Sequence, residues 1–329
     1  MRARAARLAC LILLAKFSAV LAAQAPATAS AAQEPIVPLP AQQPTTSLPT
    51  PEPITPIPLP PPADPRKIAL GARLFAEPRL SGNNGRSCAT CHNLERNGAS
   101  RVPFDRAPDG SPLSFNTITV FNSALSFRLG WEGQQRTLEQ QIAALLANPA
   151  IMDCAGELGA GKLAADPALR RDFEAVYGRG PDADNVVDAL ATFERSLITP
   201  GSRFDRWLEG DAKALTAQEL AGYRLFKSLG CVSCHQGVNV GGNLYERHGI
   251  FHPLARPDPQ ILRVPSLRNV ATTAPYFHDG SAPTLQVAVR QMGRAQLDSM
   301  LTDSQVENIV AFLRTLTGLY RGRPVGDPQ

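Results

Sequence analysis

Three features are scarce in this sequence: excess charge of one sign, long apolar runs and potential metal ligands. The formal net charge of the 329 residues is only +4. Four of the positive side chains lie in the first twenty positions: Arg2, Arg4, Arg7 and Lys16. The rest of the chain is therefore near neutral, which excludes the strongly basic surface that nucleic-acid binding requires.

The apolar run from Leu8 to Leu21 is short and is interrupted by Lys16, so it does not predict a membrane span. No other segment approaches the pattern of a membrane helix. The run follows arginines and precedes small residues, which is the arrangement of a secretory signal. We predict a signal peptide over residues 1–25 and export of the remainder, with an uncleaved N-terminal anchor as the alternative.

Proline dominates the next segment, which we interpret as a linker over residues 26–65. Thirteen prolines fall between Pro35 and Pro65. Such a composition favours extended polyproline II over a packed core, so a spacer is expected. The length of the remaining chain then predicts two globular domains, over residues 66–203 and 204–329.

Those two domains are predicted to be mainly α-helical, because strand signals are weak throughout. Apolar spacing predicts helices near residues 68–75, 138–146 and 185–197. Capping-box spacing at Thr216–Glu219 and Thr302–Gln305 marks the start of two more helices. On the last of these, one face carries the apolar residues Val306, Ile309, Val310, Leu313 and Leu316.

Two Cys-x-x-Cys-His motifs are the most specific feature of the chain. They are Cys88-Ala-Thr-Cys91-His92 and Cys231-Val-Ser-Cys234-His235. Cysteines at this spacing reach the two vinyl groups of one porphyrin, and the histidine that follows lies under the iron. Zinc would need two further ligands per site, and a disulfide or thioredoxin-like pair would not need the histidine. We therefore predict two covalently bound haems c, with His92 and His235 as iron ligands.

The second axial ligand of each iron decides between electron transfer and peroxide chemistry. No histidine lies between His92 and His235, and Met152 is the only methionine there. The second half of the chain offers more candidates, namely Met292, Met300, His248, His252 and His278.

Three segments resemble the bacterial di-haem cytochrome c peroxidase and MauG family. They are Leu70 to Ser81 leading into the first motif, Phe193 to Asp205, and Val264 to Gly280. The resemblance covers residues 66 to 318. It implies a mainly α protein of two cytochrome c-like domains, each around one covalently bound haem, in a periplasmic location. It also implies that a homodimer is one oligomeric state to test.

Carried over residue by residue, the resemblance implies several roles. Met292 matches the distal ligand of the C-terminal, electron-accepting haem. Trp131 matches the tryptophan between the two haems, and Gln141 matches a glutamine beside the N-terminal, peroxide-binding haem. A calcium ion between the domains is implied by the match of three residues, Asn116, Thr273 and Pro275, with hard oxygen ligands of the kind that calcium prefers.

The chain departs from the family pattern at two places. Ile151 stands where the family has a glutamate that acts as acid and base in peroxide cleavage. Asp153, Glu157 or a water held by Gln141 are candidate substitutes.

The second departure is the loop from Asn93 to Phe115, which contains no distal histidine and so resembles MauG. MauG, however, closes its other haem with a tyrosine, where this chain has Met292. Arg101 and Arg106 are solvated loop charges or pocket residues. Cys154 is either a buried apolar residue or a redox-active thiol.

These residues predict a peroxidase that reduces hydrogen peroxide to water with electrons from a small cytochrome c or a cupredoxin. The first alternative is a MauG-like enzyme that oxidises side chains of a protein partner. The second is a di-haem electron carrier or redox sensor without enzymatic activity, which the isoleucine at position 151 favours.

Overall fold

The computed structural model describes residues 51–256 and 258–326. The predicted signal peptide and the linker up to residue 50 lie outside the described residues. Helices predominate, and the strands form two short antiparallel hairpins. The elements are α1 (Pro65–Phe75), η1 (Pro78–Leu80), α2 (Cys88–Cys91), η2 (Ser123–Leu125), α3 (Leu138–Ala147), α4 (Gly156–Ala164), α5 (Pro167–Tyr177), α6 (Ala183–Ser196), α7 (Arg203–Leu208), α8 (Ala217–Ser228), η3 (Cys231–Ser233), β1 (Tyr245–Arg247), β2 (Ile261–Arg263), η4 (Val270–Thr272), α9 (Leu285–Leu297), α10 (Asp303–Arg314), β3 (Leu319–Tyr320) and β4 (Arg323–Pro324).

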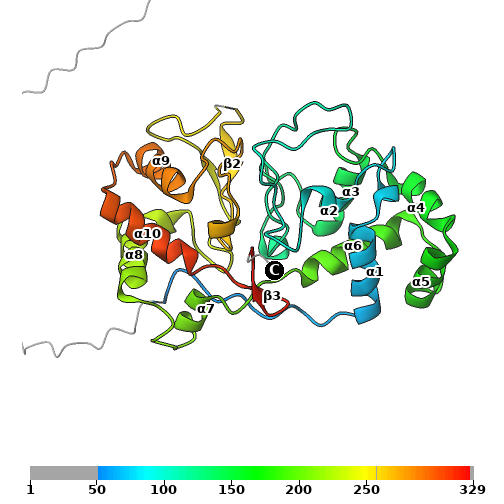
Figure 1. Cartoon of the computed structure of the whole chain (residues 1–329), viewed down its shortest axis with the longest axis horizontal. Helices are drawn as coiled ribbons and strands as arrows, with labels where there is room; N and C mark the ends of the chain where they lie inside the picture. The colour runs from blue at the N-terminus through cyan, green and yellow to red at the C-terminus, as the bar shows by residue number, and fades with distance from the viewer. Residues whose placement is uncertain (1–50, 257, 327–329) are drawn as a thin grey trace, which may run out of the picture. The chain divides into compact units, whose positions relative to one another are not determined.

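The helices gather in two groups, each with its own apolar core: α1 to α6 in one and α7 to α10 in the other (Figure 1). The prediction of a mainly α fold is confirmed. Among the described residues, no helix has both the length and the apolar character needed to cross a membrane.

The two groups share one packing device. In the first, α1 crosses α6 at Gly71, where an added Cβ would lie 2.1 Å from the backbone oxygen of Ala189. In the second, α8 crosses α10 at Gly222, where an added Cβ would lie 1.8 Å from the backbone oxygen of Asn308. Only glycine allows backbones to approach so closely. In each group the helix with this glycine precedes the Cys-x-x-Cys-His motif in the chain, so the second half repeats the plan of the first.

The helices predicted from apolar spacing and caps are present as α1, α3, α6, α8 and α10. The hydroxyls of Thr216 and Thr302 accept hydrogen bonds from the third helical residue, as a capping box requires. The predicted apolar face of α10 is buried throughout. Helices α4, α5, α7 and α9 were not predicted. In α4 the reason is its composition, because glycine and alanine leave little apolar period to detect.

The last part of the predicted linker is packed against the second group of helices. We call residues 51–62 the strap. Ile54 and Ile57 of the strap are 1% and 5% exposed. The Glu52 carboxylate accepts a hydrogen bond from the hydroxyl of Tyr223 at 2.5 Å. The backbone oxygen of Thr55 accepts one from the Arg268 guanidinium at 2.8 Å. An extended proline-rich backbone has no internal hydrogen bonds, so its carbonyls are free for such contacts.

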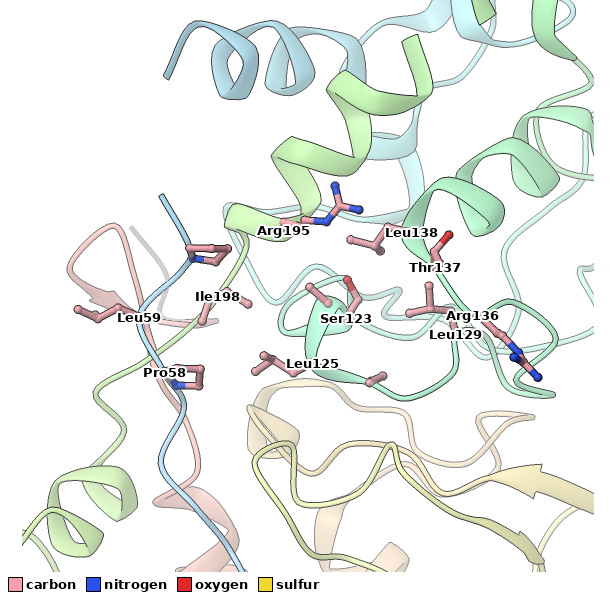
Figure 2. A pocket seen from close by; sticks show the side chains of 13 residues that line it. Pro58, Leu59, Ser123, Leu125, Leu129, Arg136, Thr137, Leu138, Arg195 and Ile198 are labelled. Carbon is pink, nitrogen blue, oxygen red and sulfur yellow. The ribbon is translucent and has the colours of Figure 1, made fainter. Parts of the chain in front are cut away.

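Farther along, the strap borders a small pocket of about 290 Å³ (Figure 2). Pro58 and Leu59 form one side of it, and η2, with Ser123 and Leu125, forms the other. Arg195, near the end of α6, lines the same pocket. The strap therefore contacts both groups of helices and is not a free spacer over these residues.

Replacing Ile54 with alanine is expected to lower the free energy of unfolding by about 2–5 kcal/mol, because the change empties a fully buried site. Urea denaturation of the full chain measures this. Leu59→Ala is the matched control in the same strap, since Leu59 is 80% exposed and should change stability by less than about 0.5 kcal/mol. Equal effects of the two substitutions would show that the strap is not anchored at Ile54.

Candidate active site: one cavity with both cysteine motifs

Both Cys-x-x-Cys-His motifs line one cavity of roughly 1030 Å³. The first motif begins on α2 and the second on η3, and in each group the helix with the crossing glycine precedes the motif in the chain. Most of the other lining side chains are apolar. A cavity of this kind suits large, mostly apolar ligands that carry a few polar groups.

The two motif histidines, His92 half-buried and His235 buried, are oriented in the same way. The Nδ1 of His92 lies 2.9 Å from the backbone oxygen of Gly98, and that of His235 lies 3.3 Å from the backbone oxygen of Val240. A carbonyl only accepts, so Nδ1 carries the proton and Nε2 is left as a lone-pair ligand. Burial lowers the pKa of His92 and lowers that of His235 to about 4, so both rings are neutral, the form that binds metals.

The four motif cysteines are free thiols, so they do not form the disulfides that were the alternative interpretation of the two pairs. Burial raises the pKa of Cys88 to about 12 and that of Cys91 and Cys231 to about 11. The rings of Phe75 and Phe226 lie 6.5 Å and 6.3 Å from the motif histidines that follow them. Free thiols, oriented imidazoles and an apolar chamber are together the donor set that a covalently attached haem requires.

Met292 lies on α9 and lines the cavity. Met300, the other sulfur candidate in the second half, is 83% exposed and does not line it. Helix α9 therefore presents one of the two sulfurs to the chamber of the second motif. In the first half, Met152 also lines the cavity and is buried in the N-terminal core.

The three further histidines have different surroundings. The imidazole Nε2 of His252 pairs with the carboxylate of Asp298 at 2.8 Å, outside the cavity. His248 and His278 line the cavity with ring centroids 4.9 Å apart. Burial lowers the pKa of His278, and its Nε2 has no partner among the described residues.

Trp131 is held between the two groups of helices. Its indole Nε1 donates to the backbone oxygen of Asn116 at 2.7 Å. Its own backbone oxygen accepts from the amide of Arg263 at 2.8 Å, and the Arg263 Nε donates to the backbone oxygen of Gly130. Trp131 thus lines the same cavity as both motifs, and hydrogen bonds from both groups of helices determine its orientation.

The three residues of the predicted calcium site, Asn116, Thr273 and Pro275, all line the cavity. The Asn116 amide nitrogen donates to the backbone oxygens of Val102 and Pro103. Its side-chain oxygen is left without a donor among the described residues. The backbone amide of Asn116 donates to the backbone oxygen of His278 at 2.7 Å, which joins the two groups of helices at this point.

The predicted distal pocket is only partly assembled from the residues that the sequence suggested. Gln141 and Ile151 both line the cavity. The carboxylates of Asp153 and Glu157 are exposed and do not line it, so neither replaces the missing glutamate from its present position.

The loop arginines Arg101 and Arg106 are exposed as well, and neither lines the cavity. Cys154 is 1% exposed and contacts a backbone oxygen through its thiol. The burial of Cys154 supports its interpretation as a buried apolar residue over that as a redox-active thiol.

Two cavity residues carried no sequence signal. Arg263 is 4% exposed, and burial lowers its pKa to about 10. One of its guanidinium nitrogens has no partner among the described residues. Glu194 on α6 is 9% exposed and also faces the cavity. Both are brought to the site by packing between segments that are distant in sequence, which no local pattern reveals.

Comparison with known proteins agrees with this geometry. A model of the di-haem cytochrome c peroxidase family matches residues 65–213, and a cytochrome c model matches residues 220–317. A cytochrome c551 peroxidase of Nitrosomonas europaea is 41% identical over 264 residues, which cover 76% of this chain and 79% of the relative. The chain belongs to the di-haem cytochrome c peroxidase family. This confirms the predicted family, the predicted pair of c-type haems and the predicted class of enzyme, an oxidoreductase that acts on peroxide.

Two further relatives are less identical to this chain than the Nitrosomonas europaea peroxidase. The methylamine utilization protein MauG of Methylorubrum extorquens is 31% identical over 277 residues, 77% of this chain and 78% of the relative. The crystal structure of a MauG-like protein associated with microbial copper homeostasis superposes with a TM-score of 0.65 at 28% identity. It covers 83% of this chain and 95% of that protein.

Proposed function

We propose that this chain is a periplasmic di-haem peroxidase that reduces hydrogen peroxide to water with electrons from a small cytochrome c or a cupredoxin. The observation that carries the proposal is the single cavity that both motifs line, together with Trp131, which hydrogen bonds to Asn116 and Arg263 hold in place. An electron that enters at one motif can reach the other without leaving the protein interior.

In this proposal Cys88 and Cys91 attach the N-terminal haem, and His92 ligates its iron. Attachment of the C-terminal haem falls to Cys231 and Cys234, with His235 and Met292 as ligands. The haems, when bound, supply the redox chemistry, and histidine–methionine ligation favours the higher potential of an electron-accepting site. The chain's own contribution is orientation of the imidazoles, exclusion of water by the apolar lining, and placement of Gln141 beside the peroxide chamber.

We also propose that the oxygens of Asn116, Thr273 and Pro275 hold a calcium ion between the two groups of helices. The support is the unpartnered Asn116 side-chain oxygen and the hydrogen bond from Asn116 to His278 that already joins the groups at this position. A cation there would keep the two motifs at one separation. The predicted signal peptide would export the chain to a compartment where paired cysteines commonly form disulfides. The four motif cysteines are nevertheless free thiols, as covalent haem attachment requires.

Steady-state turnover of the full holoprotein with hydrogen peroxide and reduced cytochrome c or cupredoxin tests the activity. We expect oxidation of two one-electron donor molecules for each peroxide consumed, at rates far above those of free haem. Matched Cys91→Ala and Cys234→Ala variants should each lose turnover, because each disrupts attachment of one haem. Turnover no faster than free haem would overturn the proposal.

A MauG-like activity on a protein partner is the second candidate. The observation that favours it is the N-terminal part of the cavity, where His92 is the only histidine among the described lining residues from the first half of the chain. Peroxide-dependent oxidation of side chains in a co-purified protein, detected by mass spectrometry, would support it. Met292 at the place of the MauG tyrosine counts against it.

A further inference from the structure

An acid/base group accelerates peroxide cleavage, and this chain has Ile151 where the resemblance to the family implies a glutamate. An alkyl side chain cannot move a proton, whereas a positioned carboxylate moves one well. The exposed Asp153 and Glu157 do not reach the cavity. Either the protein lacks such a group, or a carboxylate elsewhere in the fold supplies it.

Three carboxylates line the cavity among the described residues: Glu132, Glu194 and Glu246. Glu132 is exposed and accepts a hydrogen bond from Gln134. Glu246 lies on β1 in the second group of helices and accepts from the amide of Arg247. Glu194 differs from both because it is buried and belongs to the first group, whose motif carries His92.

Glu194 lines the same cavity as the first haem-attachment cysteine. The charge of its carboxylate raises the pKa of the Cys88 thiol, second only to the effect of burial. Gln141 and Ile142 of α3 and Leu190 of α6 line the same cavity, and Ile142 and Leu190 belong to the same apolar core. No hydrogen bond or ion pair reaches the Glu194 carboxylate from any residue that the structure describes.

The neighbouring arginine does not neutralise it. Arg195 pairs with Glu139 on α3 and lines the small pocket of Figure 2. Successive helical residues point about 100° apart, so Glu194 and Arg195 face different chambers. Burial raises the pKa of Glu194 to about 7, and Arg195 opposes this only in part. A carboxyl group with such a pKa can both accept and donate a proton near neutrality.

We propose that Glu194 is the acid/base group of the N-terminal chamber and takes the place of the glutamate that Ile151 replaces. This inference rests on the proposed peroxidase function. The Glu194 carboxylate accepts a proton from one oxygen of hydrogen peroxide and returns it to the other oxygen. The O–O bond breaks, and that other oxygen leaves as water. Two molecules of reduced donor protein supply two electrons in total, solvent supplies two protons, and the remaining oxygen becomes a second water.

Glu194→Gln in the full holoprotein tests the proposal, with Glu157→Gln as the control on an exposed carboxylate. Stopped-flow absorbance gives the rate of the peroxide-induced spectral change as a function of pH, apart from turnover. Two groups interact electrostatically with Glu194, namely Cys88 and Arg195. In the holoprotein the Cys88 sulfur is a thioether and does not titrate, and Arg195 forms an ion pair with Glu139. In the wild type we expect the rate to rise with pH through about 7, as the accepting carboxylate forms.

Glu194→Gln is expected to lower that rate by about 10²- to 10⁴-fold and to remove the pH-dependent rise. Haem content and the spectra of the resting and reduced protein should not change. Adding Ile151→Glu to the Glu194→Gln protein should restore part of the rate, because it returns a carboxylate to the same chamber. Wild-type rates in Glu194→Gln at every pH would overturn the proposal.

Glu194→Asp is the second variant, in case glutamine at this position impairs haem loading. It keeps the carboxyl on a shorter arm, so a slower rate with a displaced pH rise is expected, and an unchanged profile would count against the proposal. If wild-type protein shows the spectral change without donor turnover, and Glu194→Gln slows it, the peroxidase function fails while the role of Glu194 stands. If the wild type turns over and Glu194→Gln turns over equally fast, the peroxidase function stands and the role of Glu194 fails.

Discussion

The Met292→Ala protein is expected to bind both haems and to have a C-terminal haem whose reduction potential is lower by on the order of hundreds of millivolts, within the roughly 0.8 V span that axial ligands cover. With Met292 as the proposed iron ligand, its thioether would stabilise the reduced iron, and alanine would remove that ligand. Because Met292 lines the cavity from α9, its removal opens this chamber. Donor-dependent turnover should fall with the potential, since the C-terminal haem then accepts electrons less readily. Spectroelectrochemical titration of both haems measures the shift.

Met300→Ala is the matched control for this substitution. Met300 lies three residues beyond α9, is 83% exposed and does not line the cavity. Its replacement should leave both potentials and turnover unchanged. A lowered potential in Met300→Ala with an unchanged potential in Met292→Ala would show that Met300 is the sulfur ligand. That result would overturn the proposed role of Met292.

Replacing Asp205 with alanine is expected to destabilise the protein by about 3–5 kcal/mol, because it leaves a buried guanidinium without its counter-charge. Asp205 and Arg268 pair at 2.7 Å with side chains 1% and 0% exposed. Arg268 also donates to the backbone oxygens of Val238 and of Thr55 in the strap. One cation thus ties together α7, the loop after the second motif and the strap. The urea midpoint of the holoprotein is the measurement.

Asp303→Ala gives the comparison for an exposed pair. Asp303 pairs with Arg290 but is 84% exposed, so its loss should cost less than about 1 kcal/mol. Replacing both Asp205 and Arg268 with apolar residues should be less harmful than Asp205→Ala alone, since the uncompensated charge then disappears. Equal loss in Asp205→Ala and Asp303→Ala would show that the buried pair does not stabilise this region.

The helices that sequence analysis found are those whose signals are local. Thr216 and Thr302 cap their helices through residues three positions away, so the chain needs no tertiary partner to show them. Helix α9, which carries Met292, begins at a capping Thr284 but has no such box, and it was missed. The strap was interpreted as a spacer because its prolines outweighed two isoleucines, whose burial depends on a surface that other segments build.

The chemistry of haem attachment was determined by the sequence alone, because both thiols and the proximal imidazole of each motif lie within five consecutive residues. Tertiary structure decided what surrounds those groups. It placed Met292 and not Met300 at the cavity, fixed Trp131 between Asn116 and Arg263, and brought Glu194 into the same cavity as Cys88. These pairs are separated by many residues, and their contacts depend on how helices pack rather than on any local pattern. The absent glutamate at position 151 was visible in the sequence, whereas the buried carboxylate that we propose in its place was visible only in the fold.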